Sequence, residues 1–379
     1  MVRIRARWET LALAAAVAFA GGVAFVMAGP LDPPAGPVAP TNKTLSEVEP
    51  RIAINFANTP GDSDSLYKIT QPGSYYLTGN ITGVSGKRGI EVASSGVTVD
   101  LNGFTLQGVT GGLEGIKSNG VDLTGISLRN GVVRGWPLDG VNIGSGPVFA
   151  GCVDGVVAEA NGGDGLQLGN QIAITRCSSI NNVGYGFLAA STCTFTNCSA
   201  RGNGIDGFYC TVSGTFNNCA AYLNTGNGFL STFDTAAYDN CTSGYNVGDG
   251  FHLASSASVT ACVSANNKGS GFLISTHSTI SGCTAYSNAI GAATGGNIRV
   301  TGADNHVVGN NCTSGLRGIQ IVSTGNFISK NVCSGNTTNW DVVSGNVCLV
   351  VSATTAGAIS GNSGGAAPGS TDPNANFTY

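Results

Sequence analysis

Four charged residues hold one position of a repeating pattern, directly before a glycine that is followed by a large apolar residue. They are Arg88, Glu114, Asp139 and Asp164. If the segments between them are stacked β-coils, successive carboxylates would lie about 5 Å apart. Such a group could bind Ca²⁺, or share a proton as an acid and a base, with Lys117 close by. These four residues are therefore the candidate catalytic residues.

A structural interpretation of the same position is preferred, because Asn227 and Ser270 also occupy it. Asx–Gly pairs suit turns for conformational reasons alone. The sequence holds no C-x-x-C pair, so a structural zinc site is not expected. We assign no cofactor, and Ca²⁺ is the one metal ion that the carboxylates could hold.

A second position, two residues after each glycine, changes character along the chain. It carries Glu91, Lys117, Asn142 and Gln167, and then Leu188, Tyr209, Leu230, His252 and Leu273. Because side chains alternate along a strand, these residues should face away from the core. The last five predict an exposed apolar and aromatic stripe that could stack sugar rings. The alternative is that the C-terminal tail or another chain covers this stripe.

The composition limits the classes of protein that can present such surfaces. The chain has 379 residues, of which 58 are Gly and 12 are Cys, and only 10% are charged. Charge this sparse does not suit a helical bundle or a highly charged disordered chain. The net charge of -4 argues against nucleic acid as a partner. A turn-rich, repetitive β protein remains.

The glycines keep a period of 21 to 26 residues, and two further residue types follow the same period. A cysteine column comprises Cys152, Cys177, Cys198, Cys219, Cys241, Cys262, Cys283, Cys312 and Cys333. An asparagine column comprises Asn161, Asn182, Asn203, Asn224, Asn246 and Asn267. Within each unit, apolar residues alternate with polar ones and are broken by Gly and Asn, which indicates short strands and turns. A unit of this length predicts one coil of a β-solenoid, with Phe, Cys and Asn forming structural ladders.

The cysteine column is predicted to consist of buried free thiols. In-register side chains on neighbouring coils lie one strand spacing apart, but their Cα–Cβ bonds run parallel and do not converge as a disulfide requires. Thiols in such a column would pack as small apolar groups.

The segments Tyr75–Leu77, Gly89–Ile90 and Val97–Gly103 resemble the opening coils of right-handed parallel β-helix proteins of the pectate-lyase-like superfamily. The later N-x-x-x-G-F units resemble uncharacterised bacterial exported β-helix repeat proteins. The resemblance implies an all-β fold of about 12 to 13 coils. It does not imply one activity, because this fold carries lyases, hydrolases, epimerases, adhesins and tailspikes. The signature motifs of its polygalacturonases and pectate lyases are absent.

The expected organisation has four parts. Residues 1–28, with Arg3, Arg5 and Arg7 before an apolar run, predict a signal peptide or an uncleaved N-terminal anchor. Residues 29–50 form a Pro-rich linker, 51–350 the β-helix with an N-terminal cap, and 351–379 a C-terminal tail or cap. A secreted, periplasmic or cell-surface protein is expected, with membrane contact only through an uncleaved N-terminal segment.

Three functions are compatible with these patterns. The first is non-catalytic binding of a polysaccharide or another surface component along the stripe Leu188–Leu273. The second is a polysaccharide lyase or glycoside hydrolase that uses Glu114, Asp139 and Asp164. The third is a structural spacer at the cell surface.

Overall fold

The structure is a computed structural model that describes residues 49–120, 122–144, 149–233, 235–352, 359–361 and 372–379. These residues form forty strands and no helix, and from Arg51 onward they belong to one compact unit. The described part of the chain therefore contains no helix that could cross a membrane. The predicted signal peptide or anchor at 1–28 and nearly all of the linker at 29–50 lie outside the described residues.

One face of the molecule, called face 1, is a 14-stranded parallel sheet that receives one strand from each coil. Its strands are β2 (Ser65–Ile69), β5 (Arg88–Val92), β8 (Ile116–Ser118), β10 (Val141–Asn142), β12 (Leu166–Leu168), β15 (Phe187–Ser191), β18 (Phe208–Val212), β21 (Phe229–Ser231), β24 (Phe251–Leu253), β27 (Phe272–Ile274), β30 (Ile298–Val300), β33 (Arg317–Ile321), β36 (Thr338–Val342) and β39 (Ile359–Gly361). The stack therefore has about fourteen coils, compared with the 12 to 13 that the sequence predicted.

The other strands form a 26-stranded sheet with two faces, joined by two long strands that run across both. These are β9 (Thr124–Arg134) and β11 (Phe149–Glu159). Face 2 adds β1 (Ile52–Ala53), β3 (Gly73–Tyr76), β6 (Val97–Asp100), β13 (Asn170–Thr175), β16 (Thr194–Thr196), β19 (Thr215–Asn217), β22 (Ala237–Asp239), β25 (Ser258–Thr260), β28 (Thr279–Ser281), β31 (His306–Val308), β34 (Phe327–Ser329) and β37 (Val347–Cys348). Face 3 adds β4 (Ile81–Thr82), β7 (Thr105–Gln107), β14 (Ser178–Ile180), β17 (Ser199–Arg201), β20 (Ala220–Tyr222), β23 (Thr242–Gly244), β26 (Val263–Ala265), β29 (Thr284–Tyr286), β32 (Asn311–Thr313), β35 (Val332–Ser334), β38 (Val350–Ser352) and β40 (Asn376–Thr378).

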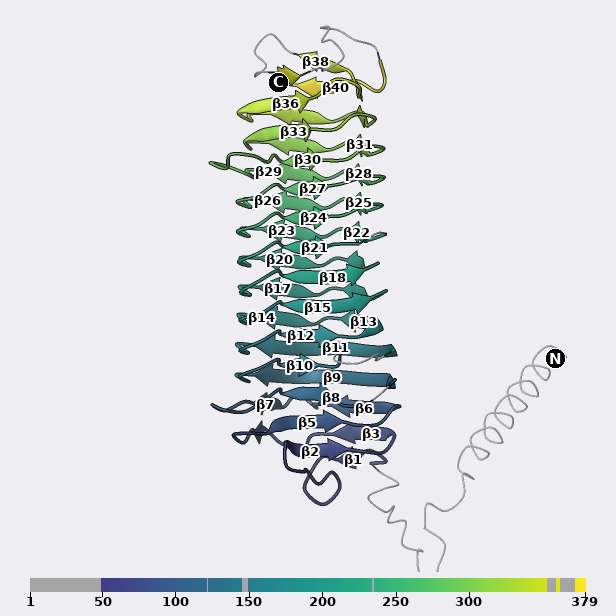
Figure 1. Ribbon diagram of the computed structural model, residues 1–379, viewed down its shortest axis with the longest axis vertical. Coiled ribbons are helices and arrows are strands. Elements are labelled where there is room, and N and C mark those ends of the chain that lie inside the picture. Colours follow the sequence, from purple (N-terminus) through teal and green to yellow (C-terminus); the bar gives the residue numbers. More distant parts are fainter. Residues whose placement is uncertain (1–48, 121, 145–148, 234, 353–358, 362–371) are drawn as a thin grey trace, which may run out of the picture. The chain divides into compact units, whose positions relative to one another are not determined.

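All pairings between these named strands are parallel, and they join equivalent positions of successive coils (Figure 1). On face 1, Phe187 pairs with Phe208, which is one 21-residue period later. The alternation of buried and half-exposed side chains continues along the strands, as in β15, where Phe187 is buried and Leu188 is half-buried. The β-solenoid with parallel strands is therefore the fold that the repeat predicted.

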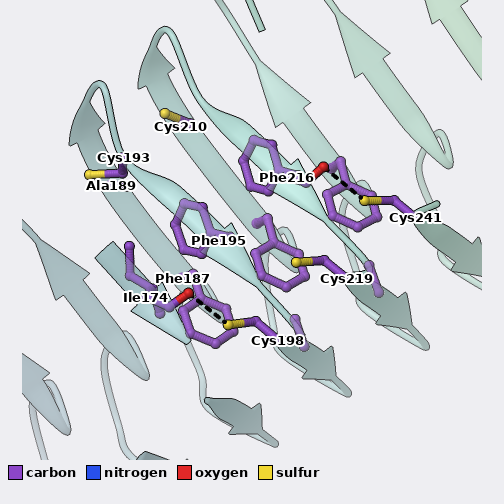
Figure 2. Packing of buried hydrophobic residues seen from close by; sticks show 14 of the residues in the cluster. Ile174, Phe187, Ala189, Cys193, Phe195, Cys198, Cys210, Phe216, Cys219 and Cys241 are labelled. Atoms are coloured by element: carbon purple, nitrogen blue, oxygen red, sulfur yellow. Dashed lines mark hydrogen bonds between the residues drawn. The ribbon is translucent and has the colours of Figure 1, made fainter. Parts of the chain in front are cut away.

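Two aromatic ladders fill the middle of the stack. The rings of Phe187 and Phe208 on face 1 are parallel, with centroids 4.7 Å apart, and those of Phe195 and Phe216 on face 2 are parallel at 4.8 Å. The two ladders meet edge to face, with 5.7 Å between the centroids of Phe187 and Phe195 (Figure 2). Both geometries are favourable for aromatic rings. The coil spacing thus sets the ring spacing, and each ring contacts its equivalents above and below.

The asparagine column forms a continuous hydrogen-bonded ladder at the corner between faces 3 and 1. The Asn182 Nδ2 group donates to Asn203 Oδ1 at 3.0 Å, and the Asn182 backbone N–H donates to the same oxygen at 3.1 Å. The Nδ2 group also donates to the carbonyl of Ala158 at 3.2 Å. Each amide therefore satisfies buried backbone groups that the turn leaves unpaired. The ladder continues beyond the predicted residues through Asn288 and Asn297.

Six of the predicted cysteines form the expected ladder: Cys177, Cys198, Cys219, Cys241, Cys262 and Cys283. They are free and buried. The Cys198 thiol lies 3.4 Å from the carbonyl oxygen of Thr196, and the Cys241 backbone N–H donates to the Cys262 sulfur at 3.3 Å. Figure 2 shows three of these sulfurs beside the phenylalanine rings. The thiols pack as small apolar groups that also bond to the backbone.

The prediction that Cys312 and Cys333 continue this ladder is wrong. The coil after Cys283 is longer than its neighbours, and the Cys283 backbone N–H donates to Asn310 Oδ1 at 2.9 Å. Asn310 therefore occupies the ladder position. Cys312 lies two residues further on, pairs with Ala285 and stacks on Cys333 in the interior of face 3. Because two residues are one strand period, both cysteines still point into the core.

Cys152 was also wrongly placed in the ladder. It pairs with Ala173 in face 2 and is half-buried. Ser178, the residue after Cys177, pairs with Val157, so Cys152 precedes the ladder position by four residues. Gly140 precedes Phe149 by nine residues, whereas Gly165 precedes the paired Asn170 by five, so the four additional residues lie between the glycine and β11.

The C-terminal strand β40 is inserted between earlier strands of face 3. It pairs with β35 on one side and with β38 on the other. Asn376 of this strand accepts hydrogen bonds from the backbone N–H of Asn331 at 2.9 Å and from its Nδ2 group at 2.9 Å. The last residues of the chain thus supply an amide to the asparagine series that begins at Asn310.

We expect Tyr238→Phe to stabilise the fold. Tyr238 continues the face 2 ladder, with its ring centroid 4.7 Å from that of Phe216, and its hydroxyl is buried without a hydrogen-bond partner. Removing an unpaired buried hydroxyl should increase the free energy of unfolding by about 1 kcal/mol. The measurement is equilibrium denaturation with urea. A variant less stable than the wild-type protein would show that the hydroxyl has a partner.

Candidate functional site

The candidate catalytic residues Glu114, Asp139 and Asp164 lie on successive coils, directly before β8, β10 and β12. Their carboxylates have different hydrogen-bond and ion-pair partners. Glu114 Oε1 is 2.6 Å from Lys117 Nζ, and its Oε2 is 3.0 Å from Arg88 Nε. Burial by itself would raise the pKa of Glu114, but the two cations hold it below its usual value. Glu114 is therefore a charged member of an ion-pair cluster.

The two aspartates accept backbone hydrogen bonds from the next coil. Asp139 Oδ1 accepts the N–H of Asp164 at 2.7 Å, and Asp164 Oδ1 accepts the N–H of Tyr185 at 2.8 Å. The same bond recurs further along, where Asn227 Oδ1 accepts the N–H of Asp249 at 2.8 Å. A neutral amide makes the bond as well as a carboxylate does. This geometry supports the structural interpretation of the column.

Two aspartates of this column have raised pKa values. Burial, together with the nearby Asp139 carboxylate, raises the pKa of Asp164 from 3.8 to about 6. Burial also raises the pKa of Asp206, although the backbone N–H of Asn227 opposes the shift. Both carboxylates are thus costly to ionise in the folded protein.

In the described part of the chain, Asp62, Asp64 and Glu91 are the three acidic residues whose carboxylate oxygens come within 4.8 Å of one another. The predicted group of Glu114, Asp139 and Asp164 does not meet this condition. Lys68 Nζ lies 2.7 Å from Asp62 and 2.8 Å from Glu91.

Arg88 pairs with Asp64, so cations already neutralise these carboxylates. The cluster is an ion-pair network that joins the first coils, and it does not offer the open carboxylates that a Ca²⁺ site needs.

The predicted stripe is present on the outer side of face 1. Its five residues pair in register from β15 to β27, in the order Leu188, Tyr209, Leu230, His252 and Leu273. All five are half-buried, so each presents part of its side chain to solvent.

The described residues of the C-terminal tail, 372–379, lie against face 3 and do not cover the stripe. The tyrosine rings of Tyr185 and Tyr209 are 5.3 Å apart and widen the aromatic surface.

A cavity of about 300 Å³ opens beside the stripe. His252 and Leu273 line it, together with Ser231, Thr232 and Thr301. The pocket therefore combines an apolar wall with the hydroxyl groups of Thr232 and Thr301.

His252 pairs with Asp249, which precedes it by three residues. His252 Nδ1 lies 3.0 Å from Asp249 Oδ2, while Asp249 Oδ1 accepts the N–H of Ser270 at 2.6 Å. Asp249 is thereby held by the backbone and can orient the imidazole, leaving Nε2 available to a ligand. The sequence analysis did not identify this pair, although the Asp-x-x-His spacing at a turn was a usable signal.

A second hollow of about 280 Å³ lies over face 2 and is lined by Asp304, His306, Phe327 and Val347 among others. His277 Nε2 is 3.5 Å from Asp304 Oδ2, and both side chains are mostly exposed. His277 lies in the same coil as Leu273, between β27 and β28, and the residues that line the hollow belong to the three following coils.

Neither a family model nor a curated protein sequence matches the chain. Several solved structures resemble it. The A-module of the Azotobacter vinelandii mannuronan C-5 epimerase AlgE6 has a TM-score of 0.53 and 17% identity, covering 73% of this chain and 90% of that one. The AlgE4 A-module of the same organism has a TM-score of 0.46 and 15% identity, covering 71% and 82%. The pectate lyase Pel9A has a TM-score of 0.37 and 17% identity, covering 71% of each chain.

The stacked parallel coils and the likeness to the AlgE6 module show a protein with the parallel β-helix fold. This is the fold that the sequence resemblance indicated. At this level of identity the likeness shows the fold alone, and activity has to be argued from the residues on face 1.

We expect Asp164→Asn to stabilise the protein at about pH 8 and to change its stability little at about pH 4. The folded-state pKa of about 6 lies above the usual 3.8, so stability falls as the pH rises through this window and the loss persists above it. Asparagine removes that cost and can still accept the Tyr185 N–H, as Asn227 does for Asp249. Melting temperatures between these pH values should diverge by a few degrees.

Asp239→Asn, on the outer side of face 2, is the matched control and should show no such divergence. An effect of Asp164→Asn that does not vary with pH would contradict the assigned titration.

Proposed function

We propose that this protein is an exported β-helix that binds polysaccharide along the stripe of face 1. The observation that carries the proposal is the in-register column from Leu188 to Leu273, half-exposed over five coils, with a cavity beside it. A partly exposed apolar column of this length is typical of an interaction site.

The shape of the stripe suits a linear glycan. Its residues recur at the coil spacing of about 4.8 Å, so they present repeated contacts along one direction. Tyr209 and His252 offer flat rings to the apolar faces of sugars, and the hydroxyls of Thr232 and Thr301 supply polar partners. The AlgE6 module, which has the same fold, is by its name an enzyme acting on mannuronan. The pattern of residues 1–28 supports export to the periplasm, the cell surface or the medium.

The double variant Tyr209→Ala with His252→Ala should lose binding by at least about tenfold, because two stacking contacts are removed. The measurement is a screen of immobilised glycans, followed by calorimetry on the best ligand. The matched control is Thr194→Ala with Thr215→Ala on the exposed side of face 2, also on neighbouring coils.

The control should bind as the wild-type protein does. A broad screen without any ligand, or a loss of binding in the control variant alone, would refute the proposal and favour the structural-spacer function.

A second function, a polysaccharide lyase or hydrolase, is favoured by the Asp249–His252 pair. A histidine oriented by a fixed carboxylate can move protons at a bound sugar, and the raised pKa of the nearby Asp206 would suit a general acid. For this second function we propose His252 as the candidate catalytic residue, in place of Glu114, Asp139 and Asp164.

If the protein is an enzyme, His252→Ala and Asp249→Asn should each lower its activity by about 100-fold or more, because they remove the base or its orientation. The assay follows new reducing ends and unsaturated products on uronate-containing and neutral glycans, with and without Ca²⁺. Asp239→Asn should retain full activity. Absence of turnover on every substrate would leave binding as the function.

A further inference from the structure

The outer column of face 1 continues past the apolar stripe into polar residues. Leu273 pairs with Arg299, Arg299 with Gln320, and Gln320 with Asp341. Arg299 is therefore the first charged residue next to the stripe in the C-terminal direction. Its neighbour Leu273 lines the 300 Å³ cavity, as does Thr301, which directly follows β30.

Arg299 is a cation without a counter-ion among the described residues. The nearby carboxylate of Asp341 is already used, because Arg317 Nε lies 2.8 Å from its Oδ2 and Gln320 Nε2 donates to the same oxygen at 3.0 Å. Arg129 and Arg176, by contrast, are paired with aspartates. The guanidinium of Arg299 is thus held on the binding face but not neutralised.

Two polar atoms at these positions are also unsatisfied. Arg299 Nε is a buried donor without a partner, and Gln320 Oε1 is a buried acceptor without one. Gln320 is only 7% exposed. Buried polar atoms without hydrogen bonds are rare in folded proteins and often indicate a missing water, ion or ligand.

We propose that Arg299 recognises an anionic substituent of the bound glycan, a carboxylate or a sulfate, with Gln320 placed to bond a neighbouring hydroxyl. This inference rests on the proposed function and names the class of glycan that the stripe selects. A guanidinium binds such oxyanions with two parallel hydrogen bonds. The apolar stripe then supplies stacking contacts, while Arg299 at its end discriminates between charged and neutral polymers.

The test uses three polymers with one backbone: dextran, carboxymethyl dextran and dextran sulfate. The full-length protein should bind at least one of the charged polymers tighter than dextran, measured by calorimetry at low and physiological salt. Arg299→Gln should weaken binding of that polymer by at least about tenfold and leave any binding of dextran unchanged. Arg299→Lys should recover only part of the affinity, because an ammonium lacks the planar fork.

The matched control is Arg201→Gln, which removes an exposed arginine on face 3 that likewise has no ion pair among the described residues. It should bind as the wild-type protein does. Equal losses in both variants would indicate attraction to net charge alone and would overturn the assignment. A purely structural Arg299 would lower the melting temperature of Arg299→Gln and leave its affinity unchanged, which would also overturn it.

The two proposals can fail separately. If the glycan screen finds an uncharged ligand that Tyr209→Ala with His252→Ala no longer binds, and Arg299→Gln binds it normally, polysaccharide binding stands and the anion subsite does not. If Arg299→Gln loses the charged polymer while the double variant retains it, the anion subsite stands and the stripe does not.

Discussion

In-register stacking of coils is the constraint on which the whole molecule depends. Each coil lies one strand spacing from the next, so every side chain meets its own equivalent above and below. Positions where identical neighbours attract become ladders, as the parallel rings of Phe187 and Phe208 do. At other positions the turn would leave backbone groups unpaired. A side chain there must form hydrogen bonds both to the backbone and to the equivalent side chain of the next coil. Asparagine meets that need at the corner.

The same constraint decides which residues remain available for chemistry. Asp139 and Asp164 form a column before the glycines, and there one oxygen of each carboxylate accepts an N–H of the next coil. Glu114 and Glu91 are held by lysine and arginine side chains at the start of the stack. The outer side of face 1 is different, because its strands are already satisfied by their neighbours. Side chains there can vary without cost to the stack, and the stripe, which includes His252, and Arg299 both lie on it.

Much of the fold could be predicted because the spacing of equivalent residues in the sequence gives both the length of each coil and the residue type of each ladder. The thiol ladder from Cys177 to Cys283 and the asparagine column followed in this way. The errors at Cys152, Cys312 and Cys333 arose where coil length changes. A count of residues cannot tell whether an insertion precedes or follows a corner. Only the structure shows that the backbone N–H of Cys283 donates to the amide oxygen of Asn310, at the position where a cysteine sulfur accepts this bond in earlier coils.

The sequence by itself determined the β-solenoid, its aromatic and thiol core and the outward stripe, because alternation and period act between residues close in the chain or one coil apart. The tertiary structure decided which polar groups have a hydrogen-bond or ion-pair partner and which have none. Whether a carboxylate is paired depends on atoms contributed by neighbouring coils and on burial, and neither follows from spacing. For that reason Glu114 could be found from the sequence but its neutralisation could not, and the unpaired Arg299 became visible only in the folded chain.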